Sequence, residues 1–367
     1  MQEYDAFYDS KLAKELVASI HRLFSEKKNF LPKKITMMEV CGTHTMEIGR
    51  LGIRHLLPAE ISLLSGPGCP VCVTPSSYIE EALELVKNSK NCLVTFGDLI
   101  HVPGKKVSLA FAKAQGCDIR VITSPLQILE MAKDEPSKEF IFTSIGFETT
   151  VPVTAKTVFM AHQKKLKNIS FLVAHRVVPP VLQALIEDPD LSISGFLLPG
   201  HVSAVIGEDG YQILHEHCVP GVITGFAPVD ILGGILSLLE MLTERPKACV
   251  KNMYTRFVSP HGNTKALELI HSIYEPCDAV LRGIGIVKLC GLKLRKNYES
   301  YDAQKKYGIE IQGEEMPVGC SCGQVLKGLI RPNECPLFKK ACTPDHPVGP
   351  CMVSTEGSCA AYFRYGY

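Results

Sequence analysis

The sequence predicts an α/β protein built from parallel sheets and covering helices. Between about residues 35 and 235, short apolar runs end in loops rich in glycine, proline and polar residues, and helix-like segments follow. The runs are continuously apolar rather than alternating, which is typical of strands buried on both faces of a parallel sheet. With 367 residues, 46% hydrophobic and 21% charged, the chain can form two or three domains with cores of their own.

Eight apolar runs are the expected strands. In chain order they are ITMMEV (35–40), EISLLS (60–65), CLVTF (92–96), IRVIT (119–123), FIFTSI (140–145), SFLVA (170–174), SGFLL (194–198) and GVIT (221–224). Apolar residues spaced three and four apart predict crossover helices at 77–89 and 125–134. The strand number alone fits two small doubly wound sheets or one (β/α)₈ barrel.

The pattern changes near residue 245, where we place a domain boundary. Segments 263–275 and 298–308 are helix-like, and segment 279–295 is partly extended and interrupted by glycine. A tail rich in proline and cysteine, residues 317–359, then shows neither helix nor strand periodicity.

Charge and hydropathy restrict the compartment and the partners. Lys plus Arg number 39 and Asp plus Glu 38, so the chain lacks the bulk charge that attracts nucleic acid or anionic membranes. The N-terminus lacks the basic and apolar regions of a signal peptide. The most apolar long stretch, 221–242, contains Pro228, Asp230 and Glu240, which favour a buried helix over a membrane span. We therefore expect a cytoplasmic protein that binds no nucleic acid and no membrane.

Fifteen cysteines in such a chain need a chemical explanation. Structural disulfides are rare in the cytosol, so metal binding or redox chemistry is the better expectation, and the odd number argues against complete pairing. Some cysteines lie in or beside apolar runs, and we interpret these as small core residues: Cys92, Cys117, Cys218, Cys249, Cys277 and Cys290.

The tail holds six further cysteines within about 40 residues: Cys320, Cys322, Cys335, Cys342, Cys351 and Cys359. Its prolines prevent a long helix, and a bound metal can supply the missing order because its binding energy becomes folding energy. The wide spacings suit a [4Fe–4S] cluster better than the tight cysteine pairs of zinc sites, although zinc and unligated thiols remain alternatives. We expect Cys322, Cys335, Cys342 and Cys359 as ligands, with Cys320 or Cys351 as possible replacements.

Three more cysteines follow the first two strands. Cys41 ends the run 35–40 with His44 three residues on, where a helix N-terminus would stabilise a thiolate and His44 could carry protons. Cys69 and Cys72 form a C-x-x-C, which suits a reversible disulfide or half of a metal site. If the two strands are neighbours, the three thiols form a soft-ligand site for Fe(II), Cu(I) or zinc. A buried cysteine beside a capping threonine is the simpler alternative for Cys41.

Other strand-end loops carry candidate proton donors and acceptors. Glu148 in GFETT and His201 in PGHVS could transfer protons or cap helices. Three further residues could likewise transfer protons or have a structural role, and a structural role is favoured for each: His175, His101 and Asp230.

The sequence resembles the HypD family of [NiFe]-hydrogenase maturation proteins. The resemblance runs from about 36 to 365 and is carried by CGTHT, GPGCPVC, GFETT, PGHVS and the tail CPLFKKACTPDHPVGPCMVSTEGSCAAY. It implies a redox-active scaffold that assembles an Fe(CN)₂CO group together with a HypC-type small chaperone, with cyanide from a HypE-type donor, and a scaffold role is favoured over that of an enzyme. The alternative is an iron–sulfur thiol–disulfide reductase similar to ferredoxin–thioredoxin reductase.

The resemblance also implies residue roles and a domain plan. Cys41 would be the iron-site thiolate with His44 beside it, Cys69 and Cys72 the redox pair, and the tail cysteines the [4Fe–4S] ligands. Two small doubly wound α/β domains are expected instead of a barrel, followed by a mixed third domain that carries the cluster. We assign the domains to residues 35–118 with 221–245 returning, to 119–220, and to 1–34 plus 246–367.

Overall fold

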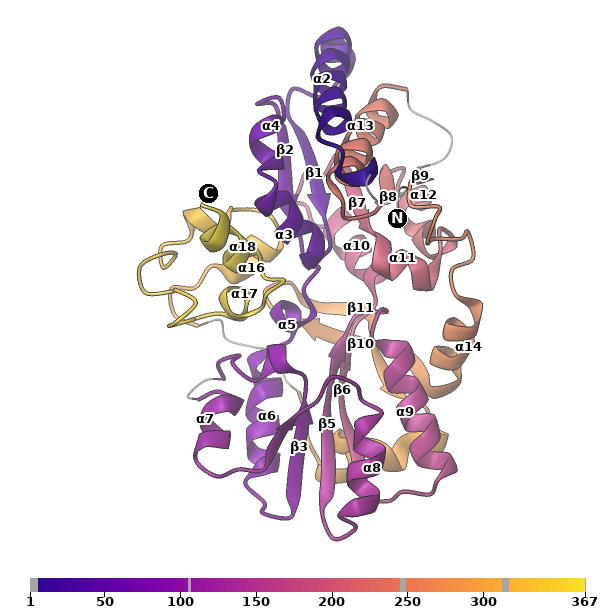
Figure 1. Ribbon diagram of the computed structural model, residues 1–367, viewed down its shortest axis with the longest axis vertical. Coiled ribbons are helices and arrows are strands. Elements are labelled where there is room, and N and C mark those ends of the chain that lie inside the picture. The colour runs from indigo at the N-terminus through magenta and orange to yellow at the C-terminus, as the bar shows by residue number, and fades with distance from the viewer. Residues whose placement is uncertain (1–5, 105–106, 245–248, 312–316, 367) are drawn as a thin grey trace.

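A computed structural model describes residues 6–104, 107–244, 249–311 and 317–366. It contains two separate parallel sheets, as Figure 1 shows. Sheet A has the order β2-β1-β7-β8-β9 and is formed by β1 (Ile35–Glu39), β2 (Ile61–Ser65), β7 (Gly195–Pro199), β8 (Gly221–Thr224) and β9 (Val250–Asn252). Sheet B has the order β4-β3-β5-β6 and is formed by β3 (Asn91–Thr95), β4 (Ile119–Val121), β5 (Glu139–Gly146) and β6 (Ile169–His175). The predicted α/β class is confirmed, and a barrel is excluded.

Each of the eight predicted runs forms a strand, but the strands are distributed differently from the predicted domain plan. β3, placed in the first domain, pairs in parallel with β4 and β5 of sheet B. β7, placed in the second domain, pairs with β1 of sheet A. The chain therefore crosses to sheet B after β2 and returns after β6. Tertiary packing determines which sheet each strand joins, and the order of strands in the sequence does not. The predicted boundary at 245–246 lies outside the described residues.

Helices cover both faces of both sheets, and further helices lie in the connections and in the tail. They are α2 (Ser10–Lys27), α3 (Gly42–Arg50), α4 (Ile53–Leu56), α5 (Pro70–Val73), α6 (Ser76–Val86), α7 (Leu109–Ala114), α8 (Gln127–Asp134), α9 (Val151–Gln163), α10 (Val178–Ile186), α11 (Gly200–Ile206), α12 (Gln212–Glu216), α13 (Pro228–Glu244), α14 (Thr264–Ile273), α15 (Ala303–Tyr307), α16 (Cys322–Leu326), α17 (Pro350–Val353) and α18 (Ser358–Tyr365). Short 3₁₀ turns lie between them: η1 (Ala6–Tyr8), η2 (Lys28–Phe30), η3 (Gly97–Leu99), η4 (Asp209–Tyr211), η5 (Lys296–Tyr301) and η6 (Pro332–Glu334).

The alternation of side chains along each strand divides the core. Met37 of β1 and Leu197 of β7 pack in one cluster with α2 and α13, whereas their neighbours Met38 and Leu198 pack on the other face with α10 and α12. In sheet B, Phe142 packs in a cluster with α8 and α9, and on the other face Ile141 packs with α6 and α7. Burial on both faces explains why the strands are continuously apolar in sequence.

The remaining part of the chain is less regular. An antiparallel hairpin, β10 (Tyr274–Leu281) and β11 (Gly285–Leu294), contacts β6, and α14 packs on α9. The tail then returns to the middle of the molecule, where α17 contacts α5 and α18 contacts α3 (Figure 1). Across the described ranges, no helix combines the length and the apolar character needed to cross a membrane.

Candidate functional site

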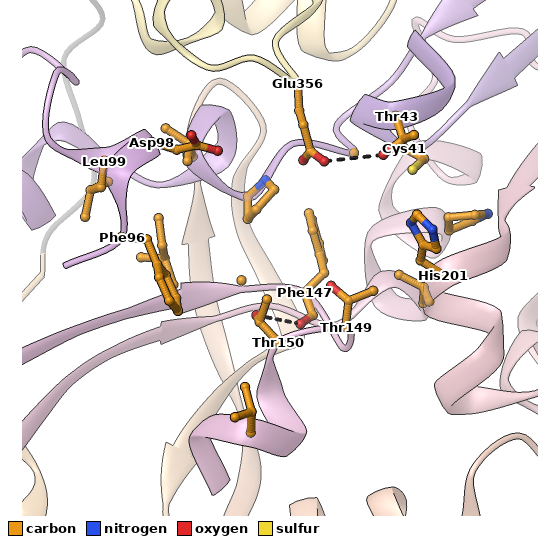
Figure 2. Close-up of a pocket in the computed structure, with 18 of the residues that line it drawn as sticks. Cys41, Thr43, Phe96, Asp98, Leu99, Phe147, Thr149, Thr150, His201 and Glu356 are labelled. Atoms are coloured by element: carbon orange, nitrogen blue, oxygen red, sulfur yellow. Dashed lines mark hydrogen bonds between the residues drawn. The ribbon is translucent and has the colours of Figure 1, made fainter. Parts of the chain in front are cut away.

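The carboxyl ends of the two sheets open into one pocket of about 620 Å³, which we call the Cys41 pocket (Figure 2). Cys41, after β1, and His201, after β7, line it from sheet A. Asp98, Ser124 and Thr149, which follow β3, β4 and β5, line it from sheet B. Parallel strands place their loops at one edge, so two sheets with facing carboxyl edges bring loops from distant segments to one cavity.

Cys41 occupies the junction between β1 and α3. It is the residue before the helix, with an extended backbone, and the backbone N–H groups of Thr43 and His44 lie near its sulfur and act to lower its pKa. These donors favour a thiolate, as the sequence suggests. Burial nevertheless dominates and raises the pKa of Cys41 to about 12, so the free side chain is a protonated thiol. The N-terminus of α3 alone therefore does not outweigh burial, and the role of Cys41 as a thiolate ligand stays a prediction.

His44 is fully buried and does not line the pocket. Its Nε2 lies 2.8 Å from the carbonyl oxygen of Gly225, which can only accept, so Nε2 carries the proton. Nδ1 is buried without a hydrogen-bond partner among the described residues, and burial lowers the pKa of His44 to about 4. Neutral His44 thus orients the start of α3 rather than carrying protons to solvent.

His201, by contrast, is exposed to the pocket at the start of α11. The Phe226 ring lies between the two histidines, with its centroid 4.6 Å from that of His44 and 4.1 Å from that of His201. The geometry therefore leaves His201 as the histidine able to exchange protons with a bound group. Phe226 was not predicted as a site residue, because Asp230 was the only candidate in its loop.

Glu356 brings the tail into the Cys41 pocket and was also missed. Its Oε1 accepts a hydrogen bond from Thr43 Oγ1 at 3.4 Å, as Figure 2 shows, and burial raises its pKa. A Cβ at position 42 would collide with the Glu356 side chain, so Gly42 permits this close contact. In the sequence, Glu356 is marked only as a carboxylate beside Gly357 in the tail. The cysteine spacings that predict the tail site say nothing about it.

Cys69 and Cys72 form a disulfide with Cα atoms 5.2 Å apart, and both residues are buried. The Cys69 sulfur accepts hydrogen bonds from the Cys72 N–H at 3.1 Å and from the Ser354 hydroxyl at 3.4 Å. The preceding Gly68 packs directly on the backbone of Cys41. The disulfide therefore lies behind the pocket, between the pocket and the tail.

The predicted three-thiol site is not assembled in this disulfide-bonded form. Within the described ranges, no group of three or more His, Cys, Asp or Glu side chains is arranged to hold a single metal ion. The ligand role of Cys41 therefore stays a prediction that does not depend on Cys69 and Cys72.

Glu148 faces a different region of the molecule. It lines a separate cavity of about 440 Å³ beside α14, and its Oε1 accepts a hydrogen bond from the Val178 N–H at 2.8 Å. Its Oε2 is buried without a hydrogen-bond partner, and burial raises the pKa of Glu148 to about 7. Its neighbours Thr149 and Thr150, not Glu148, reach the Cys41 pocket.

The weaker candidates have structural partners. His175 is fully buried, and its Nε2 lies 2.8 Å from the Ser144 hydroxyl. Asp230 forms a bidentate ion pair with Arg256 at 2.9 and 2.6 Å, and His101 is exposed without lining the pocket.

The six tail cysteines converge on one small apolar cavity of about 20 Å³, which we call the tail cysteine cavity. Cys322, Cys342 and Cys351 are buried, and Cys320, Cys335 and Cys359 are partly exposed. Six thiols around one apolar space are a donor set that fits an iron–sulfur cluster. The side chains of Cys320 and Cys322 contact each other, so the choice between them stays open.

Arg282 connects this cavity with the disulfide segment. Its side chain is 2% exposed, its backbone N–H donates to the Val73 carbonyl at 2.8 Å, and its Nε donates to the Thr74 carbonyl at 3.1 Å. Its positive charge favours the ionised forms of the Cys322 and Cys351 thiols and so opposes the rise in their pKa. The residues that directly follow Cys72 are thereby held against the tail cysteines.

The core interpretation of the remaining cysteines is only partly right. Cys92 and Cys290 are buried, whereas three are partly exposed and Cys218 is exposed: the three are Cys117, Cys249 and Cys277. A cysteine beside an apolar run can lie at the end of the run, where the chain leaves the core.

Taken together, the fold and the site define a class: a two-sheet α/β protein with a thiol pocket, a buried dithiol and a cysteine-rich tail. The chain belongs to the HypD hydrogenase formation family, whose model, described as "Hydrogenase formation hypA family", matches residues 11–366. It is 41% identical over 366 residues to hydrogenase maturation factor HypD of Rhodobacter capsulatus, which covers 98% of this chain and 97% of that protein. It is 37% identical over 367 residues to hydrogenase maturation factor HypD of Escherichia coli (strain K12), covering 98% of each chain.

Proposed function

We propose that this chain is a hydrogenase maturation factor that serves as a scaffold for an Fe(CN)₂CO group, held at Cys41 before delivery to a hydrogenase large subunit. The maturation role is supported by the family and by the names of the relatives. The observation that carries the proposal is the position of the Cys41 thiol at the meeting point of both sheet edges, in a pocket of about 620 Å³. A small ligated metal group fits this volume.

Cys41 would provide the metal–sulfur bond. A thiolate is a soft donor that suits Fe(II) carrying cyanide and carbon monoxide. Metal coordination removes the thiol proton even when burial raises the pKa. The N–H groups of Thr43 and His44 would then share the negative charge on the sulfur.

The pocket wall opposite Cys41 would recognise the ligands of the iron. Hydroxyl groups of Ser124 and Thr149 line the pocket, and hydroxyls can donate hydrogen bonds to cyanide nitrogen, whereas the Thr150 hydroxyl donates to the Phe147 carbonyl. His201 can supply or accept protons there. The described lining includes Asp98 and Glu356 but no lysine or arginine, so neutral donors would bear the stabilisation of an anionic group.

Electrons would come from within the chain. A [4Fe–4S] cluster held by Cys322, Cys335, Cys342 and Cys359, with Cys320 or Cys351 as a possible replacement, would supply them one at a time. The Cys69–Cys72 pair stores two electrons as a dithiol. Ser354 can stabilise charge on the Cys69 sulfur, and the same tail turn places Glu356 in the Cys41 pocket.

Two partners follow from this scheme. A HypC-type small chaperone would share the iron group at the open side of the pocket, and a HypE-type protein would deliver cyanide. Their binding would be transient because the group must enter and leave the same pocket.

The test is iron content and infrared spectroscopy on the protein coexpressed with its small partner and purified without oxygen. Cyanide and carbonyl bands should be present in the wild type and lost in Cys41→Ala. The control is Cys117→Ala, since Cys117 is partly exposed and lies outside the pocket. Bands that persist in Cys41→Ala would refute the assignment of the iron site.

The alternative function is a stand-alone thiol–disulfide reductase. The disulfide argues against it, because Cys69 is 4% and Cys72 0% exposed, which closes both sulfurs to a protein substrate. Turnover of a protein disulfide, without iron at Cys41, would favour this alternative.

A further inference from the structure

Cys218 and Cys249 meet on the surface, although 30 residues separate them in the sequence. Cys218 is exposed after α12, and Cys249 is partly exposed directly before β9. The parallel strands β8 and β9 pair Gly221 with Val250, so both cysteines lie at the amino edge of sheet A. This edge is opposite to the one that carries Cys41, and neither residue takes part in the proposed assembly chemistry.

His215 holds the two cysteines together. The Cys218 N–H donates to the His215 carbonyl at 3.2 Å, and the Cys218 thiol contacts the same oxygen at 3.8 Å. The Cys249 N–H donates to His215 Nδ1 at 3.4 Å. The Cys218 thiol lies close enough to that of Cys249 to raise the pKa of Cys249, after the larger effect of burial. A left-handed backbone at Cys218, with φ 51°, is part of this arrangement.

We propose that Cys218 and Cys249 form a reversible disulfide by exchange with low-molecular-weight disulfides of the glutathione class. The exposed Cys218 thiolate attacks one sulfur of the small disulfide, which releases one small thiol and leaves a mixed disulfide. The Cys249 thiolate then attacks the Cys218 sulfur, forms the internal disulfide and releases the second small thiol. Two protein thiols are oxidised, one small disulfide is reduced, and the two thiol protons appear on the two released thiols.

Accessibility distinguishes this pair from the other neighbouring cysteines outside the described sites. Cys277 and Cys290 also interact, but Cys290 is 0% exposed and lies beside the buried Arg176. Its partner Cys277 is only partly exposed, whereas Cys218 is open to solvent. Disulfides of intracellular proteins are mostly transient and redox-responsive, which fits an exposed pair with a partly buried resolving thiol.

The experiment uses the full chain, reduced and kept without oxygen, then treated with oxidised glutathione. Remaining thiols are alkylated, and peptides are mapped without reduction. We expect a cross-linked peptide pair that joins Cys218 to Cys249, with a mass about 2 Da below the sum of the two reduced peptides. Dithiothreitol should restore both free thiols.

Variants separate the two steps. Cys249→Ser should accumulate glutathione on Cys218 as a lasting mixed disulfide, because the resolving thiol is missing. Cys117→Ser, which changes another partly exposed cysteine, should leave the cross-link unchanged. The proposal is overturned if wild-type Cys218 keeps its glutathione while Cys249 stays free, or if Cys218 does not react at all.

Discussion

The Cys41 pocket and the tail cysteine cavity both gather sulfur, but they are built in opposite ways. The Cys41 pocket is formed by loops at the ends of regular parallel strands. The register and burial of these strands determine where each loop begins. The tail cysteine cavity is formed by four short turns and helices, α16, η6, α17 and α18, with a small apolar cluster around Phe338 and Tyr362. The first site is thus positioned by the backbone before any ligand binds.

The second site would depend on the cluster that we propose for its sulfurs. Prolines and short elements give the tail few backbone hydrogen bonds within regular structure, so the binding energy of the proposed cluster would contribute to its folding. The two sites nevertheless share residues 354–356, because Ser354 contacts Cys69 and Glu356 reaches the Cys41 pocket. A change in the order of the tail should therefore reach the pocket through this turn.

The largest expected effect comes from removing the iron of the [4Fe–4S] cluster that we propose for the tail. Anaerobic chelation should raise amide hydrogen exchange across residues 320–359 by roughly a thousandfold or more, while the strands of both sheets keep their protection. Hydrogen exchange followed by mass spectrometry measures both regions in one sample. Cys41→Ala is the control, since it empties the pocket of its thiol and should leave tail protection unchanged. Equal loss of protection in the tail and the sheets would break the comparison.

The next effect tests the rigid side of the comparison at Gly68. A Cβ there would collide with the backbone N and Cα of Cys41, neither of which can move without shifting β1. We expect Gly68→Ala to lower the free energy of unfolding by about 3 kcal/mol. Gly233→Ala, within α13, is the matched control, because its Cβ would lie 3.5 Å from Met253 Cε, an ordinary contact. This substitution should be neutral or raise the free energy of unfolding by about 0.5 kcal/mol. Urea unfolding measures both, and a neutral Gly68→Ala would show that the pocket backbone adapts.

The difference between regular strands and the irregular tail also explains which features the sequence could predict. The strands were predictable because burial on both faces leaves a continuous apolar run, as in β5 and β6. Sheet membership was not, because the pairing of β3 with β5 and of β7 with β1 depends on packing between distant segments. The tail was predictable as a cysteine cluster but not as a wall of the Cys41 pocket.

Side-chain position within the site was harder still. The loop positions of Cys41 and His201 follow from the strand ends, but the burial of His44 depends on Gly225, 181 residues away. Glu148 and Thr149 are adjacent in sequence and reach different cavities. Such differences arise from the direction of single side chains, which no local pattern encodes.

A smaller effect concerns the pH dependence of the sheet region through Glu148. Its folded pKa of about 7 lies above the unfolded value of 4.5, so the unfolded chain releases its proton first as the pH rises. Stability should therefore fall between about pH 4.5 and pH 7 and level off above. Glu148→Gln keeps an acceptor for the Val178 N–H and removes this loss, so its stabilisation should be about 2 kcal/mol greater at pH 8 than at pH 5.5. Denaturation of both proteins at the two pH values measures the difference, and a constant difference would contradict the prediction.

The smallest expected effect separates the two histidines that share the Phe226 ring. Phe226→Leu removes both ring contacts and should cost about 1 kcal/mol of stability. His44 keeps its hydrogen bond to Gly225, so its imidazole should hold its orientation, whereas the exposed His201 loses its main contact and should reorient. Imidazole NMR shifts and nuclear Overhauser contacts report each ring separately. Phe226→Tyr should restore the wild-type pattern, and Phe257→Leu, at a side chain that is 50% exposed, should leave it unchanged. Equal displacement of both histidines would mean that the ring, and not the backbone of the strand-end loops, positions this side of the Cys41 pocket.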